Sequence, residues 1–291
     1  MSRQPLRLAL IEAIAVLRDA GVDSPRADAE LLAAHVVGVE RGRLPLVPLV
    51  DPLTIETYRR LVAQRAQRIP LQHLTGWAAM GDLQVEVGPG VFIPRPETEL
   101  LLAWALSSVT TVTAPVVLDL CTGSGVLALA VAHARPDAEV HAVELDPTAL
   151  AWARRNADAQ AAAGLRGIRL HRGDVTDRAL FPEMAGRVDL VLANPPYVPA
   201  RTSVPPEVAE HDPAMAVFAG VDGLDVIRPI VSSSALWLRP GGVIGVEHDE
   251  SHADAVHSMF SARAVYAEVE THPDLAGRAR FTTATRVTPP R

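Results

Sequence analysis

Cysteine is scarce in this sequence, because Cys121 is the only one among 291 residues. One cysteine cannot form a disulfide within the chain, nor can it supply a four-cysteine zinc site. This composition is typical of a protein from a reducing compartment. We therefore expect a cytoplasmic protein with no bound metal.

Long apolar runs are missing as well. Arg7, Glu12 and Arg18 interrupt the N-terminal stretch before the core of an export signal could form. No segment approaches the roughly 20 uninterrupted apolar residues that a bilayer-spanning helix requires. We therefore expect a soluble protein without a membrane partner.

The chain also lacks an excess of positive charge, since its net charge at pH 7 is −7 and its pI is near 5.8. A protein whose affinity comes from neutralising many phosphates carries the opposite sign. A nucleic-acid substrate is disfavoured on this ground, although a local basic patch would still permit one.

Hydrophobic residues make up 48% of the chain, which is enough for one large domain and a smaller accessory domain. From Leu6 to about Arg68, apolar residues recur at helical spacing, which predicts an all-helical module over residues 1–71. Over residues 72–96, apolar and polar residues alternate and Gly88-Pro89-Gly90 marks a turn. This pattern predicts a β-hairpin that links the two domains.

Over residues 97–291, short apolar runs alternate with helical stretches, which predicts a doubly wound, mostly parallel sheet of the Rossmann-like α/β class. Only residues 271–279 separate the last two strands, too few for a crossover helix, so the final strand must be antiparallel. The seven predicted strands are Val116 to Leu120, Val140 to Leu145, Ile168 to His171, Val188 to Ala193, Val243 to Glu247, Ala264 to Glu270 and Arg280 to Val287.

A glycine-containing loop follows the first of these strands and reads Asp119-Leu120-Cys121-Thr122-Gly123-Ser124-Gly125. The glycines allow a sharp turn from strand to helix and let a ligand approach the bare backbone. Glu144 ends the second strand about 20 residues further on, where its carboxylate can accept hydrogen bonds from both hydroxyls of a ribose. The same spacing also fits a dinucleotide, so a nicotinamide-dependent oxidoreductase stays open at this point.

Two further acids suit a specific cofactor. Asp119 could face the positively charged amino acid part of S-adenosylmethionine, and Asp174, followed by Val175, could meet the adenine amino group. Each could instead be a strand-end cap. Cys121 has no evident base beside it and occupies a place that favours a small side chain, so we interpret it as structural and not as a nucleophile.

The fourth strand leads directly into Asn194-Pro195-Pro196-Tyr197. The two prolines hold the chain extended and remove two backbone donors, which leaves carbonyl acceptors at the carboxyl edge of the sheet. Asn194 and the Pro195 carbonyl can each accept one N–H of a planar nitrogen and aim its lone pair at a methyl donor. Tyr197 can pack against the planar group. This motif predicts methyl transfer to an amide or amine without a strong base.

The sequence resembles the peptide-chain-release-factor glutamine methyltransferases over nearly its whole length. Besides the two motifs above, the resemblance rests on four segments, namely Pro70-Leu71-Gln72-His73-Leu74-Thr75-Gly76, residues 88–99 with Ile93-Pro94-Arg95-Pro96-Glu97-Thr98-Glu99, Asp222-Gly223-Leu224-Asp225 and Asp274-Leu275-Ala276-Gly277-Arg278. It implies a class I S-adenosylmethionine-dependent methyltransferase. The implied acceptor is the glutamine of the Gly-Gly-Gln loop of class 1 release factors, which would support translation termination.

The resemblance also implies site residues by position. S-adenosylmethionine, which leaves as S-adenosylhomocysteine, would contact the loop, Glu144, Asp174 and Asn194. The glutamine would meet Asn194 to Tyr197 with Phe92 and Arg95, and the segment from Phe92 to Glu99 would lie close to the active site. Two departures from the family pattern are Cys121 in place of a glycine and Val246-Glu247-His248-Asp249 at a strand end. We expect neither to touch a catalytic atom.

Three rival functions remain open on sequence alone. The first is an amino-methyltransferase that acts on adenine or guanine in nucleic acid, which the acidic charge disfavours. The second is the oxidoreductase, which would leave the Asn194 motif without a purpose. The third is an inactive adaptor, which the intact Asn194 argues against. We expect the chain to act as a monomer on a protein substrate.

Overall fold

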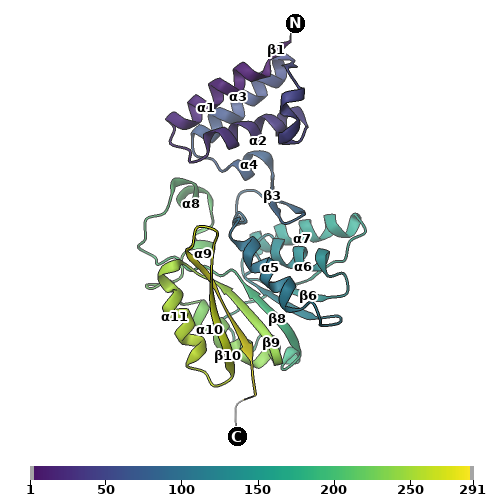
Figure 1. Ribbon diagram of the computed structural model, residues 1–291, viewed down its shortest axis with the longest axis vertical. Coiled ribbons are helices and arrows are strands. Elements are labelled where there is room, and N and C mark those ends of the chain that lie inside the picture. The colour runs from purple at the N-terminus through teal and green to yellow at the C-terminus, as the bar shows by residue number, and fades with distance from the viewer. Residues whose placement is uncertain (1–2, 289–291) are drawn as a thin grey trace. The chain divides into compact units, whose positions relative to one another are not determined.

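The computed structural model describes residues 3–288, and its contacts divide the chain into two compact units (Figure 1). The first unit comprises Met1–Trp77 together with Val204–His211, and the second comprises Ala78–Ser203 and Asp212–Arg291. A short segment from late in the chain thus belongs to the N-terminal unit. The domain limits predicted at residues 71 and 96 stay a prediction.

The first unit is built from helices, as the apolar spacing predicts, with one addition. Two-residue strands β1 (Gln4–Pro5) and β2 (Leu49–Val50) pair in antiparallel fashion. The prediction of an all-helical module was wrong in that detail, because a pair so short has no alternation that a sequence pattern could reveal. The helical segments are α1 (Leu6–Asp19), α2 (Pro25–Val37), η1 (Arg41–Leu46), α3 (Pro52–Ala66), α4 (Leu71–Thr75) and α8 (Pro206–His211).

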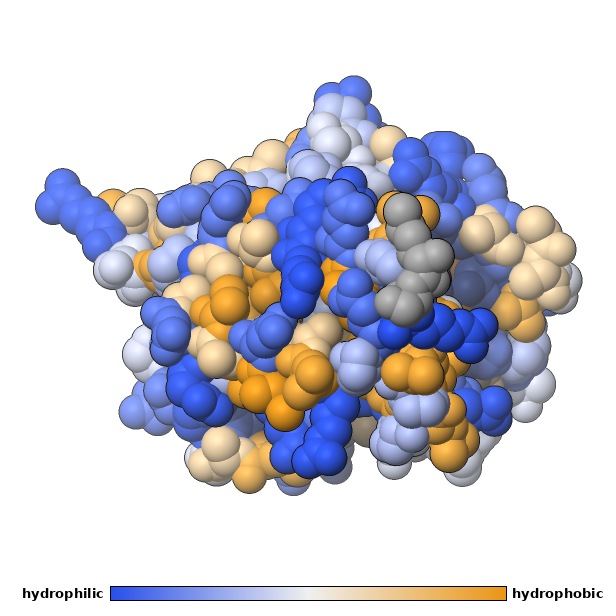
Figure 2. Space-filling model, turned by 90° about the horizontal axis from the view of Figure 1, so that it is seen from above, coloured by the Kyte–Doolittle hydropathy of each residue, from blue (hydrophilic) through white to orange (hydrophobic). Residues whose placement is uncertain are grey.

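The three long helices of this unit share one apolar core. Leu17 of α1, Leu32 of α2 and Tyr58 of α3 are buried, and the Tyr58 hydroxyl donates to the carbonyl of Ala29 at 3.0 Å. Several large apolar side chains remain exposed, including Leu46 and others of this unit. On the face shown in Figure 2, hydrophobic patches lie between hydrophilic residues.

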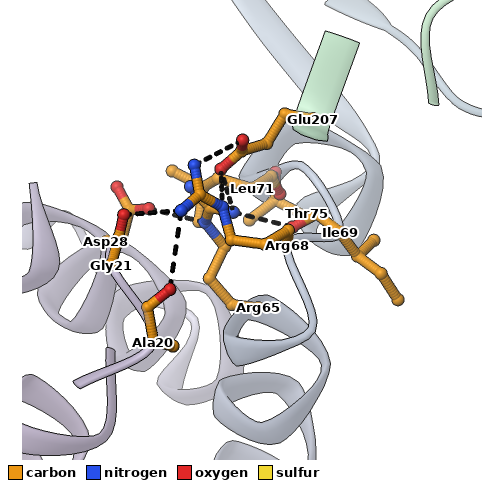
Figure 3. A network of polar contacts seen from close by, with 9 residues as sticks. All are labelled: Ala20, Gly21, Asp28, Arg65, Arg68, Ile69, Leu71, Thr75 and Glu207. Atoms are coloured by element: carbon orange, nitrogen blue, oxygen red, sulfur yellow. Dashed lines mark hydrogen bonds and ion pairs between the residues drawn. The ribbon is translucent and has the colours of Figure 1, made fainter. Parts of the chain in front are cut away.

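An ion-pair network attaches α8 to the N-terminal helices (Figure 3). Glu207 of α8 accepts hydrogen bonds from Arg68 at 2.6 Å and from Arg65 at 3.0 Å, and Arg65 also donates to Asp28 at 2.7 Å. Burial alone would raise the pKa of Glu207, but the hydrogen bonds from Arg68 and Arg65 lower it to about 2. The carboxylate therefore stays charged and paired over the physiological pH range.

The predicted β-hairpin is present, but its turn is not where the sequence placed it. Strands β3 (Trp77–Met80) and β4 (Leu83–Glu86) pair with each other, so Gly81 and Asp82 form the turn, with Gly81 at a φ of +56°. The predicted turn at Gly88-Pro89-Gly90 is also present, with Gly90 at a φ of +89°, but it follows β4 and does not join the two strands. Gly88 and Gly90 also pack closely against their neighbours. A Cβ at either position would lie 2.7 Å from a side chain of the helix at residues 147–162.

The second unit contains the predicted sheet, which has seven strands within residues 3–288. Their order is β10-β11-β9-β8-β5-β6-β7, and β11 runs antiparallel to both of its neighbours, as predicted. The strands are β5 (Val116–Leu120), β6 (Glu139–Glu144), β7 (Arg169–Arg172), β8 (Val188–Ala193), β9 (Leu238–Glu247), β10 (Tyr266–Pro273) and β11 (Ala279–Arg286).

Helices cover both faces of this sheet (Figure 1). On one face, α5, α6 and α7 enclose an apolar core with the hairpin, and on the other face α10 and α11 enclose a second core. Their bounds are α5 (Thr98–Ser108), α6 (Val126–Ala134), α7 (Pro147–Ala162), α10 (Ile227–Trp237) and α11 (Ala253–Ser261), with the short η2 (Pro182–Met184), α9 (Ala214–Val217) and η3 (Glu250–His252) between them.

The strand order fixes where a ligand can bind. The chain runs outward from β5 to β6 and β7 and then returns to β8, so β5 and β8 are parallel neighbours at the point where the order reverses. Open α/β sheets bind ligands at the carboxyl ends of the strands at this switch point. Leu120 pairs with Ala193 there, which brings the glycine loop and the Asn194 motif to the same edge.

Two features are absent from the residues that the structure describes, a membrane-spanning helix and a metal-binding cluster. Across residues 3–288, no helix is long and apolar enough to cross a bilayer. Nor does this part of the chain bring together three or more His, Cys, Asp or Glu side chains that could hold a metal ion.

Candidate active site

A cavity of about 250 Å³ lies at the carboxyl edge of the sheet, within the second unit. It brings together most of the residues that the sequence singled out. Those that line it are Phe92, Asp119, Cys121, Thr122, Gly123, Ser124, Glu144, Asp174, Val175, Asn194 and Pro196. Thr98, from the segment expected close to the site, also lines it, and so do three residues that the sequence did not single out, Met80, Met215 and Val226.

Four of the predicted site residues do not line this cavity. Gly125 is at a φ of +81° and allows close helix packing, because a Cβ there would lie 3.2 Å from the Cβ of Ala153. Arg95 forms an ion pair with Asp212, and its guanidinium lies 4.8 Å from the centre of the Phe92 ring. Pro195 is buried, and Tyr197 packs partly into the apolar core on one face of the sheet. Direct ligand contacts by these four residues stay a prediction.

The backbone of the glycine loop has a conformation at position 121 that suits glycine. Cys121 has a φ of +60°, in the left-handed region that side chains other than glycine rarely adopt. Burial, and then the nearby carboxylates of Glu144 and Asp119, raise the pKa of the Cys121 thiol well above its usual value. A protonated thiol is a weak nucleophile, which supports the structural role inferred from the sequence.

Asp119 lies beneath the loop, with only 1% of its surface exposed. Its carboxylate accepts hydrogen bonds from the Thr122 hydroxyl and, at 3.1 Å, from the Ala128 N–H in the first turn of α6. Burial nevertheless raises the pKa of Asp119 to about 7. A cation placed against this carboxyl would favour its ionised form, so the position suits a positively charged ligand.

Glu144 is held in place by the backbone. Its two oxygens accept hydrogen bonds from the N–H groups of Gly123 at 2.8 Å and of Leu145 and Asp146 at 2.9 Å. Burial raises the pKa of Glu144 against the effect of these donors. Across the cavity, Asp174 accepts from the backbone and hydroxyl of Thr176. Both carboxylates are therefore oriented by the protein itself.

Asn194 is oriented by Thr98, which lies in the segment expected close to the site, and through Thr98 by Glu247, which the sequence did not assign to the site. Its side-chain amide donates to the Thr98 hydroxyl at 3.1 Å, and that hydroxyl donates to Glu247 at 2.8 Å. The Tyr197 hydroxyl lies 3.4 Å from the other Glu247 oxygen. The only sequence signals were the Ile93 to Glu99 segment, which contains Thr98, and the strand-end departure, which contains Glu247.

The expectation that the β9 strand end touches no catalytic atom stays a prediction, but this strand end does reach the motif, since Glu247 lies 3.4 Å from the Tyr197 hydroxyl. Ala193 pairs with Val246 across β8 and β9, so Asn194, which follows β8, lies beside Glu247, the last residue of β9. This register is a tertiary property, and no local pattern in the sequence reports it.

Two family models match the chain: the PrmC N-terminal domain over residues 9–76 and the methyltransferase small domain over residues 86–210. Together with the strand order and the cavity at the switch point, they define a class I methyltransferase with an N-terminal accessory domain.

Relatives identify the family more closely. The release factor glutamine methyltransferase of Mycolicibacterium smegmatis is 53% identical over 282 residues, which cover 97% of this chain and 98% of that protein. The one from Corynebacterium glutamicum is 47% identical over 280 residues, which cover 96% and 98%. The chain belongs to the release factor glutamine methyltransferase family, as its motifs indicate.

Solved structures agree with the fold. The catalytic domain of hMettl16 in complex with an RNA hairpin gives a TM-score of 0.57 at 16% identity and covers 79% of this chain and 84% of that one. The 16S rRNA N2 G1207 methyltransferase of T. thermophilus, in complex with AdoMet and guanosine, gives 0.51 at 24% identity and covers 72% and 49%. At these identities the likeness shows the fold alone.

Proposed function

We propose that this enzyme methylates the side-chain amide nitrogen of the glutamine in the Gly-Gly-Gln motif of class 1 release factors, with S-adenosylmethionine as donor, and thereby supports translation termination. The observation that carries the proposal is the orientation of Asn194. Its amide nitrogen donates to Thr98, so its amide oxygen is left to accept a hydrogen bond from a substrate N–H. The glycine loop lines the same cavity.

The donor side offers three carboxylates with distinct tasks. S-adenosylmethionine supplies an electrophilic methyl group on a positively charged sulfur. Asp119 would hold the cationic amino group, Glu144 would accept from the ribose hydroxyls, and Asp174 with Val175 would meet the adenine. The turns at Cys121 and Gly123, which both have positive φ angles, would let the backbone pass around the donor.

On the acceptor side, the enzyme must expose a lone pair that the amide normally delocalises. The Asn194 oxygen and the Pro195 carbonyl would each accept one N–H of the glutamine, which directs the lone pair at the methyl group. The new N–C bond would form as the S–C bond breaks, with the bonding electrons staying on sulfur, and the methylated nitrogen would release its proton to water. Tyr197 and Phe92 would flank the planar amide.

The helical unit would recognise the body of the release factor. Its exposed apolar side chains, such as Leu46 at 78% and Leu53 at 70% exposure, offer area for protein contact. The net charge of −7 opposes a nucleic-acid substrate. We infer a monomeric enzyme that meets its protein substrate in the cytoplasm.

The test is a methylation assay with radiolabelled S-adenosylmethionine and purified class 1 release factors, followed by peptide mass spectrometry. We expect one methyl group on the glutamine of the Gly-Gly-Gln motif. A release factor with glutamate in place of that glutamine should accept no label, and total RNA should accept none either. Label on RNA, or on another side chain of the release factor, would overturn the proposal.

A further inference from the structure

The amide of Asn194 can face the acceptor with either its oxygen or its nitrogen, and only the first choice lets it accept a hydrogen bond. A glutamine amide presents N–H donors, so an Asn194 turned by 180° would oppose them with its own donors. Some group outside the acceptor must therefore determine which end of the Asn194 amide points into the cavity.

The contacts around Thr98 determine it. A threonine hydroxyl has one hydrogen and two lone pairs. The hydrogen of Thr98 is directed at a Glu247 oxygen, 2.8 Å away, and the ionised carboxylate can only accept it. Burial raises the pKa of Glu247 to about 7, against the hydrogen bonds from Thr98 and Tyr197, so the carboxylate is the main form above that pH. The lone pairs of Thr98 are then left for Asn194, which must turn its nitrogen toward them, at 3.1 Å.

Burial of Thr98 and Glu247 stabilises this hydrogen-bond arrangement over the alternatives. Thr98 is 3% exposed and Glu247 is 2% exposed, so water has little access to replace either partner. An unpaired donor or acceptor in such a place is costly. A second contact holds Glu247 itself, because the Tyr197 hydroxyl lies 3.4 Å from its other oxygen.

We propose that Thr98 and Glu247 are positioning residues that hold the Asn194 amide with its oxygen toward the substrate glutamine. This inference rests on the proposed function for its consequence in turnover. The orientation itself, however, is a property of the protein without any acceptor, so it can be tested separately.

The first test uses nuclear magnetic resonance of the side-chain amide protons in the enzyme without release factor. The Asn194 signal is assigned by its loss in Asn194→Asp. We expect one of its two protons to be protected from exchange with water. The protection should disappear in Thr98→Val and in Glu247→Gln, and it should persist in Thr98→Ser, which keeps the hydroxyl.

The second test measures turnover and donor affinity of the same variants. We expect Thr98→Val and Glu247→Gln to lower kcat on the order of 10- to 100-fold, with the Kd of S-adenosylmethionine within about twofold. Thr98→Ser should restore kcat to within about threefold of wild type. The matched control is Thr283→Val, because Thr283 is equally buried and bonds to His272 at 2.9 Å. It should lower thermal stability but not kcat.

The outcomes separate the two proposals. If the Asn194 protons exchange freely in the wild type, or stay protected in Thr98→Val, the positioning role is wrong. The same holds if Thr98→Val and Thr283→Val lose stability and kcat in parallel. If the protection behaves as expected but no release factor is methylated, the orientation stands and the proposed substrate fails.

Discussion

On the donor side of the cavity, polar groups are fixed mainly by neighbours that are close in the sequence, whereas on the acceptor side they are fixed by much more distant ones. Glu144 accepts from Leu145 and Asp146, which follow it directly, and from Gly123, 21 residues away. Asn194 depends on Thr98, 96 residues away, and the hydroxyl of Thr98 depends on Glu247, 149 residues away.

The difference has a functional meaning. A donor site made of one loop and a strand end holds its shape locally, so changes there should alter affinity for S-adenosylmethionine. Substitutions in an acceptor site assembled by tertiary packing should instead lower turnover, because this site orients the reacting nitrogen. Four further predictions test this division, from the largest expected effect to the smallest.

The largest effect is expected for Asn194→Asp, which is nearly isosteric. The carboxylate cannot donate to Thr98, and it places a negative charge near the buried carboxyl group of Glu247. We expect turnover with a release factor to fall about 100-fold or more, with donor affinity retained or improved. Kinetics and calorimetry on the same preparation measure both. Wild-type turnover in this variant would show that Asn194 does not orient the substrate amide.

The matching change on the donor side is Glu144→Ala. It removes the proposed acceptor of the ribose hydroxyls and leaves three backbone N–H groups without their partner. We expect binding of S-adenosylmethionine to weaken by about 1–3 kcal/mol. At saturating donor, kcat should change much less than in Asn194→Asp. An unchanged calorimetric Kd would remove Glu144 from the donor site.

The pH dependence of donor binding gives a smaller effect. The pKa of Asp119 is about 7 in the protein without ligand, and a cationic ligand favours the ionised carboxylate. Affinity should therefore rise as the pH increases through 7 and fall by up to about tenfold per pH unit below it. Asp119→Asn should bind weakly, and its Kd should lose most of this pH dependence. Equal slopes in the two proteins would contradict the assignment.

The smallest effect is expected for Cys121→Gly. The left-handed backbone at this position disfavours any side chain, although glycine loses more entropy on folding. We expect a net gain of roughly 0.5–1 kcal/mol in the free energy of unfolding. Donor affinity should be equal or better. Cys121→Ala serves as the control, because it keeps a Cβ and should show no gain in thermal unfolding.

The same division explains how much the sequence could predict. The strands, the loop and Glu144 follow from local patterns of apolar residues, glycines and acids, and the structure places them as expected. The sequence placed Thr98 only within a segment near the site and gave Glu247 no role, because their roles depend on the register between β8 and β9 and on where α5 begins. The turn at Gly88-Pro89-Gly90 is present, but it follows β4, and the hairpin itself turns at Gly81 and Asp82.

The attachment of α8 to the N-terminal unit determines which segments must be exchanged together in a chimera of two related enzymes. Because Glu207 is bound by Arg65 and Arg68, the accessory unit is discontinuous in the chain. A chimera that exchanges only the first 77 residues for those of a relative would keep one half of a buried charge network without its native partner. An exchange that also carries residues 204–211 would preserve it. Such grafts should therefore tolerate sequence divergence only when both pieces come from the same parent.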